Sequence, residues 1–169
     1  ATKNLTVRNN LIGSNTTAHS NQVINTNASP TGSFSVIGIV AASGFTGNVS
    51  IANNTVRNLS LCGPSNRSAG TTMTLSGITN ASIGGVAGAV RIDSNTIRDL
   101  NAYQTLTTAS TTVTTGLLSS GSVVSQQLNI RNNIIRDIAT TSGATSNTSP
   151  AISGINQSGG TTNYNIAGN

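Results

Sequence analysis

The chain has 169 residues and a formal net charge of +5, which arises from eight Lys and Arg against three Asp. Thr, Ser, Asn and Gly (26, 23, 23 and 18) together contribute 90 residues, whereas charged residues make up only 7%. This composition argues against a helical protein, because strong helix formers are scarce and Thr, Val and Ile favour strands. Disorder is also disfavoured, because 35% of the residues are hydrophobic and they recur at regular intervals.

The first recurring element is an alternating apolar triplet, found at 5–7, 49–51, 90–92, 128–130 and 164–166. Each triplet is followed by a bend of small polar residues that ends in an asparagine. These asparagines are Asn10, Asn54, Asn95, Asn133 and Asn169, spaced 44, 41, 38 and 36 residues apart. The alternation predicts a short strand, and Asn or Ser at the bend tolerates left-handed backbone geometry.

Two further elements follow in each period. The second is an apolar segment directly after the bend, at 11–12, 55–59, 96–100 and 134–138. The third contains a glycine followed by an apolar residue, at 37–40, 76–79, 115–118 and 153–156, and its glycines are spaced 39, 39 and 38 residues apart. Two independent markers therefore keep one period, which identifies a repeat protein.

Three short strands per period, with no helical segment between them, cannot build βαβ units but can coil. We therefore predict an all-β parallel β-helix, a single solenoid domain over 1–169. Its coils are about 1–47, 48–88, 89–126 and 127–163, with the start of a fifth at 164–169. Equivalent strands would stack about 4.8 Å apart, with Val, Ile and Leu in inward columns. The five recurring asparagines would then form a hydrogen-bonded ladder at one bend.

The cadence V-x-I-x-N-N-T-I-R-D-L … S-G-I-x-x-S-G-G-T-T resembles the right-handed parallel β-helix repeats of large secreted bacterial surface proteins. Their architecture is similar to that of pectate lyases, including an asparagine ladder at a bend. The resemblance covers essentially the whole chain. It implies a right-handed coil and a secreted, extracellular or cell-surface protein, but it leaves the function open, because this fold hosts lyases, hydrolases, adhesins and structural fibres.

The three acidic residues do not indicate an active site. Asp99 and Asp137 share one register position, where Asn58 stands in the second coil, so a short side chain at a bend is favoured over a general acid–base pair. Asp93 is expected to form an ion pair with Arg131 of the next coil, worth about 0–1 kcal/mol if exposed. We expect no enzyme activity.

Other site types are also disfavoured. His19 stands in the first loop without a nucleophile or acid beside it, and Cys62 is the only cysteine, so neither a catalytic triad nor a metal site is indicated. We expect no cofactor and no metal. Nucleic-acid binding lacks a dense basic tract with interleaved aromatics, and no apolar run is long enough to insert into a membrane.

Two surface features suggest binding. Arg57, Arg98 and Arg136 occupy equivalent positions and form a candidate anion-binding file that could grip an acidic polysaccharide. The favoured alternative is that their stems cover apolar surface while their heads bond loop carbonyls and Asp side chains. Threonine-rich runs at 71–74, 107–111 and 111–115 are expected in loops of unequal length, unlike the regular arrays of ice-binding surfaces.

The two ends of the sequence share one phase of the repeat, because residues 1–10 align with 160–169 and neither end carries a capping segment. An uncapped coil is an unpaired sheet edge, so we expect stacking head to tail on further repeats or on identical subunits. The leading hypothesis is a non-catalytic structural β-solenoid, a segment or subunit of an extracellular fibre, surface stalk or adhesin. The alternative is a glycan-binding or polysaccharide-processing β-helix module.

Overall fold

The computed structural model describes residues 2–18, 20–24, 33–42, 44–62, 72–81, 88–104, 111–120, 123–142, 151–158 and 161–169. These residues form three parallel sheets. Sheet A contains β1 (Leu5–Arg8), β5 (Val49–Ala52), β8 (Val90–Asp93), β11 (Val123–Arg131) and β14 (Thr161–Ala167). Sheet B contains β2 (Leu11–Ile12), β3 (Asn21–Ile24), β6 (Thr55–Cys62), β9 (Thr96–Gln104) and β12 (Ile134–Ser142). Sheet C contains β4 (Phe34–Ala41), β7 (Thr72–Asn80), β10 (Thr111–Ser119) and β13 (Ala151–Gln157).

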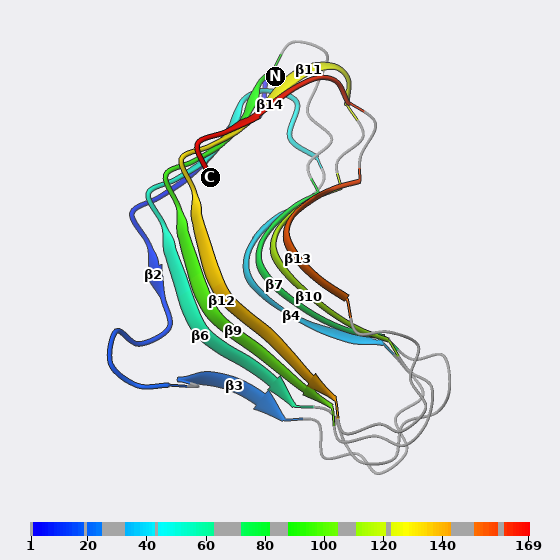
Figure 1. Ribbon diagram of the computed structural model, residues 1–169. Coiled ribbons are helices and arrows are strands. Elements are labelled where there is room, and N and C mark those ends of the chain that lie inside the picture. Colours follow the sequence, from blue (N-terminus) through cyan, green and yellow to red (C-terminus); the bar gives the residue numbers. More distant parts are fainter. Residues whose placement is uncertain are drawn as a thin grey trace.

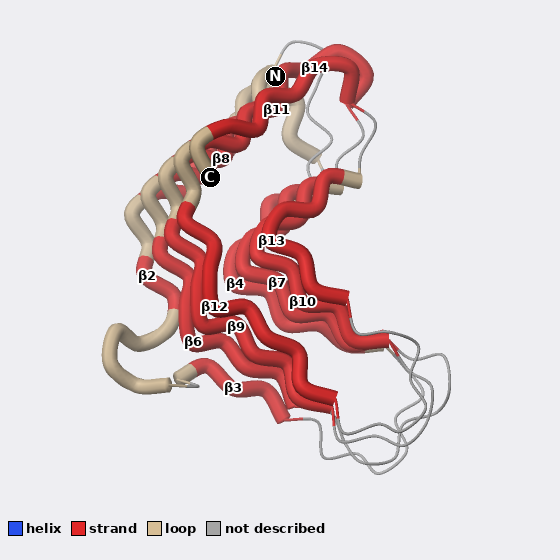
Figure 2. Tube along the Cα trace, in the orientation of Figure 1, coloured by secondary structure: helices blue, strands red, loops and turns tan. Residues whose placement is uncertain are grey.

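The chain passes through sheets A, B and C in turn and then returns to A one level further along the stack (Figure 1). Every strand pair is parallel and joins equivalent segments of neighbouring coils, such as Leu5 with Val49 and Val49 with Val90. The predicted all-β parallel β-helix is therefore confirmed. Figure 2 shows the three stacks of strands and the turns that join sheets A and B, which lie above one another at one corner.

The core consists of apolar columns that run along the stack. One column contains Val7, Ile51, Ile92, Ile130 and Ile166, which are paired in register from β1 to β14. Its three middle members are fully buried, whereas Ile166 in the last coil is 43% exposed. Each coil thus covers the apolar side chains of its neighbour, and the inward positions of the predicted triplets are confirmed.

The glycine marker of the third element has a steric cause. Sheet C approaches sheet B closely where Gly38, Gly77 and Gly116 stack. A Cβ on Gly77 would lie 2.7 Å from the carbonyl oxygen of Gly116 and would overlap the side chain of Ile97 in sheet B. At Gly154, in the last coil, a Cβ would meet nothing within 4 Å. The glycines therefore permit the close packing of two sheets.

One local prediction was wrong, and one strand was missed. The described parts of the threonine runs, 72–74 and 111–115, belong to strands β7 and β10, and Thr112, Thr114 and Thr115 are at most 1% exposed. Residues 71 and 107–110 of these runs lie outside the described residues. The first coil also differs from the expected pattern, because its sheet B segment is divided. Both β2 and β3 pair with β6, and the chain between them loops outward (Figure 1).

Candidate functional site

The corner between sheets A and B carries the predicted asparagine ladder. The ladder residues are Asn10, Asn54, Asn95, Asn133 and Asn169, and each of the first four donates its backbone N–H and its Nδ2 to the Oδ1 of the next. These eight hydrogen bonds measure 2.9–3.0 Å. The three middle residues are each 1% exposed. The ladder is thus a continuous polar column within the packed structure.

Local backbone geometry places each ladder residue. The residue before it has a positive φ of 54–58° in the first four turns, at Asn9, Asn53, Ser94 and Asn132. Asn and Ser tolerate this left-handed geometry better than larger or β-branched residues. The turn then points the following amide inward, where its Nδ2 also donates to a carbonyl of the preceding coil, as Asn95 does to Ile51 at 3.0 Å.

A second, shorter set of asparagine bonds was missed in the sequence. The Oδ1 of Asn4 accepts the backbone N–H of Asn48, and the Oδ1 of Asn48 accepts that of Ala89, both at 2.8 Å. The signal was available, because Asn directly precedes the apolar triplet in the first two coils. Alanine at position 89 ends the series. This set runs in the opposite sense to the main ladder, since here the earlier coil supplies the acceptor.

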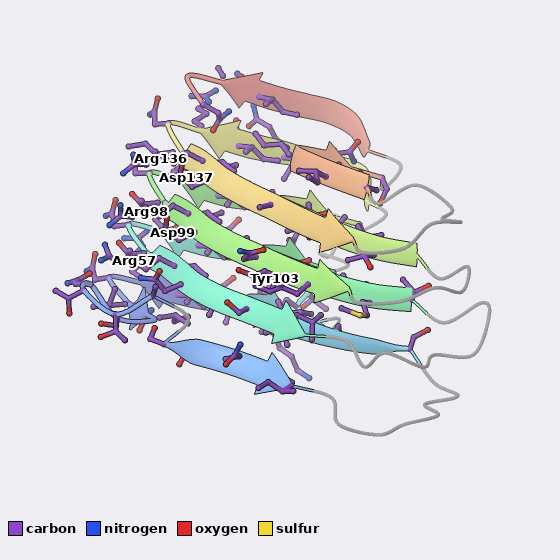
Figure 3. All side chains as sticks on the ribbon, turned by 60° about the horizontal axis from the view of Figure 1, so that its bottom comes forward. Arg57, Arg98, Asp99, Tyr103, Arg136 and Asp137 are labelled. Atoms are coloured by element: carbon purple, nitrogen blue, oxygen red, sulfur yellow. The ribbon has the colours of Figure 1, made fainter. Side chains whose placement is uncertain are left out.

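The three arginines of the candidate file do stack in register on the outer face of sheet B (Figure 3). Arg57 is only 7% exposed. Its Nε donates to the carbonyl of Ser14 at 2.7 Å, and its guanidinium also contacts the carbonyl of Asn15. The guanidinium of Arg57 is therefore engaged by carbonyl groups of the loop between β2 and β3.

The other two arginines have acidic partners. Arg98 and Asp99 approach to 3.5 Å, and Arg136 and Asp137 approach to 3.7 Å. The side chain of Arg98 is 25% exposed and that of Arg136 is 56% exposed. Each arginine of the file thus has a protein acceptor beside its head, as the favoured alternative proposed. Anion binding by the file remains an untested prediction.

The position next to each arginine requires a short polar side chain. Asn58, Asp99 and Asp137 have φ values of 54–56°, which explains why this register position carries only Asn or Asp. The left-handed residue also changes the side-chain alternation, so that Val56 and Leu59 both face the core although they are three residues apart. In the second coil, Asn58 donates its Nδ2 to the carbonyl of Ser14 at 2.8 Å, a bond that an ionised Asp could not make.

The expected ion pair between Asp93 and Arg131 does not form among the described residues. The two residues are in register on β8 and β11, as predicted, but the only ion pairs found in the described part of the chain join Arg to the Asp that follows it. Instead, the Oδ1 of Asp93 is buried without a hydrogen-bond partner. Register alignment alone did not bring the two heads together.

Within the described residues, no group of three or more His, Cys, Asp or Glu could hold a metal ion. No helix in that part of the chain is long and apolar enough to cross a membrane. His19 and the side chain of Cys62 lie outside the residues that the structure describes. The polar features left for consideration are the ladder and the two outer faces with arginines.

Comparisons of the chain with protein-family models, with curated proteins and with solved structures found no significant match. The function is therefore inferred from the geometry of the coils.

Proposed function

We propose that this chain is a non-catalytic structural β-solenoid, a segment or subunit of an extracellular fibre, surface stalk or adhesin. In this proposal the function of the chain is mechanical. Parallel backbone ladders in three sheets and a buried asparagine column hold each coil to the next, which makes a stiff rod. The observation that carries the proposal is the main ladder, because every rung repeats the same pair of bonds at 2.9–3.0 Å and so presents the same edge to a following coil.

The outermost rungs of the ladder show how a further coil would bind. Inside the stack, each Oδ1 accepts two donors from the preceding rung. Among the described residues, no donor reaches the Oδ1 of Asn10, and the backbone N–H of Asn169 has no acceptor. The free acceptor and the free donor are the two halves of one rung. A coil of the same kind, from the same polypeptide or from another copy, would complete both.

Apolar surface at the outermost coils favours the same conclusion. Ile152 and Ile166 are 52% and 43% exposed in the last coil, while Ile92, in the same column as Ile166, is fully buried in the third. Burial of apolar surface contributes about 25 cal/mol for each Å² removed from water. Stacking another coil would therefore add a hydrophobic contribution to the ladder bonds.

Electron microscopy of the purified chain tests the proposal. We expect filaments whose power spectrum contains a layer line at about 4.8 Å, the spacing of stacked strands. A variant with Ile152→Lys and Ile166→Lys should remain folded by circular dichroism but should not form filaments, because each lysine would place a charge in the contact. Monodisperse particles of the unmodified chain at high concentration would refute end-to-end stacking of this segment.

A further inference from the structure

The outer face of sheet A carries a second group of arginines, which we call the sheet A arginines: Arg8, Arg91 and Arg131. All three are exposed, and none has an ion-pair partner among the described residues. Arg8 makes one bond, from its guanidinium to the Oγ of Ser50 at 3.0 Å. These heads are therefore available to a ligand, in contrast to the arginines of sheet B.

Strand register fixes the spacing of the sheet A arginines. Arg8, Ala52, Asp93 and Arg131 form one column over four successive coils, and Arg91 lies two residues before Asp93 on β8. With coils about 4.8 Å apart, the column from Arg8 to Arg131 spans about 14 Å along the stack. The three positive charges thus follow the solenoid axis, which suits a linear ligand better than a single small ion.

The same face is hollowed on both sides of Arg91. A depression of about 270 Å³ is lined by Arg91, Asp93, Gln127, Asn129 and Arg131. A second depression of about 360 Å³ reaches from Arg91 to Arg8, and its lining includes Asn4, Thr6 and Ser50. Because both depressions share Arg91, they form one shallow polar trough along sheet A. Its amides and hydroxyls can exchange hydrogen bonds with sugar hydroxyl groups.

Asp93 gives the trough an unused acceptor. Its Oδ1 is buried without a hydrogen-bond partner, and Arg91 and Arg131 line the same depression. The Oδ1 itself is out of reach of a ligand, but the residue is only partly buried, so a ligand hydroxyl can donate to the carboxylate at its other oxygen, Oδ2, in a hydrogen bond of the stronger, charged type. A ligand that carries hydroxyl donors as well as negative charge therefore suits this part of the trough.

We propose that the sheet A trough binds a linear acidic polysaccharide, with its carboxylate groups on the sheet A arginines and a sugar hydroxyl on Asp93. A nucleic acid fits less well, because a central carboxylate repels phosphates and no aromatic side chain among the described lining residues offers a base a stacking surface. The activity is binding without turnover. It goes beyond the proposed stacking and does not depend on it, since one subunit contains the whole trough.

The test is binding of the chain to alginate, measured by isothermal titration calorimetry at low and physiological salt, with uncharged dextran as the negative control. The triple variant Arg8→Gln, Arg91→Gln, Arg131→Gln should bind at least about tenfold more weakly, because it removes the unpaired charges. The matched control is Arg98→Gln with Arg136→Gln, which changes two arginines that already face Asp. The affinity of this control variant for alginate should stay within about twofold of that of the unmodified chain.

Three results would overturn the proposal: no binding to alginate, equal losses in both variants, or binding to dextran of similar strength. Asp93→Ala separates polysaccharide from general polyanion binding, and alanine fits this position because Ala52 occupies it in the second coil. We expect this variant to bind alginate more weakly and a DNA oligonucleotide more strongly. Stronger binding of both would show that Asp93 only repels anions, and would refute the assigned hydroxyl contact.

Discussion

Replacement of a middle rung, Asn95→Ala, should destabilise the fold far more than replacement of the first rung, Asn10→Ala. The Asn95 side chain takes part in four buried or partly buried hydrogen bonds of 2.9–3.0 Å, and its Nδ2 also donates a longer one, of 3.2 Å, to the carbonyl of Asp93. The Oδ1 of Asn95 accepts both donors of Asn54, and its Nδ2 donates to Asn133 and to the carbonyl of Ile51. Alanine would remove all four and leave their partners without water to replace them.

The magnitude follows from the number of bonds and their burial. A typical intramolecular hydrogen bond contributes about 1 kcal/mol net, and a buried group left without a partner costs about 1–3 kcal/mol. Four bonds at a 1% exposed position therefore predict a loss of about 4 kcal/mol. Asn10 is exposed and its side chain donates two bonds, so its loss should stay near 1 kcal/mol. The first loss is a large share of the usual 5–15 kcal/mol stability of a domain.

Guanidinium chloride unfolding followed by circular dichroism measures both variants, and an unchanged m-value shows that the same surface unfolds. The filament state must be held constant, because association would add to the apparent stability of either variant. Equal losses for Asn95→Ala and Asn10→Ala would refute the reasoning, since exposure would then not govern the strength of a rung. A loss below about 1 kcal/mol at Asn95 would show that water replaces the ladder bonds.

Three further comparisons test the packing. Gly77→Ala should lower the free energy of unfolding by about 1–3 kcal/mol, because its Cβ would lie 2.7 Å from a carbonyl oxygen of the next coil. Gly154→Ala should leave the melting temperature unchanged, and similar melting temperatures for the two variants would contradict this reasoning. Arg57→Gln should lose about 1–3 kcal/mol through its buried bonds to loop carbonyls, whereas Arg136→Gln should stay within about 0.5 kcal/mol in urea unfolding. Asp99→Val should cost about 1–2 kcal/mol more than Asp99→Asn, because φ is 56° there and β-branched residues resist that geometry; equal unfolding midpoints would argue against it.

The repeat was predictable because its causes are local and periodic. The apolar triplets, the turn before each ladder residue and the glycine marker each reflect one steric requirement that recurs in every coil. The register Leu5, Val49, Val90 and Leu128 follows directly from alignment of the repeats.

What could not be predicted depends on distances across the sheet and on departures from the repeat. Asp93 and Arg131 are aligned in register, yet side-chain rotamers decide whether their heads meet, and alignment carries no information on rotamers. The divided strand of the first coil interrupts the pattern, so β3 could not be found by comparison with later coils. The carbonyl groups of the loop before β3 accept hydrogen bonds from Arg57, and this contact explains why the first arginine of the file is buried.

The two asparagine series together give the stack a direction. In the main ladder the later coil supplies the Oδ1, as Asn54 does for Asn10, whereas in the second series the earlier coil supplies it, as Asn4 does for Asn48. If the first coils of two copies faced each other, the free Oδ1 of Asn10 in one copy would face the same oxygen in the other, and two acceptors cannot form a hydrogen bond. A last coil brings the N–H of Asn169 instead, which matches. In the stacking that we propose, this pattern would favour head-to-tail growth over a head-to-head contact that closes the stack as a dimer.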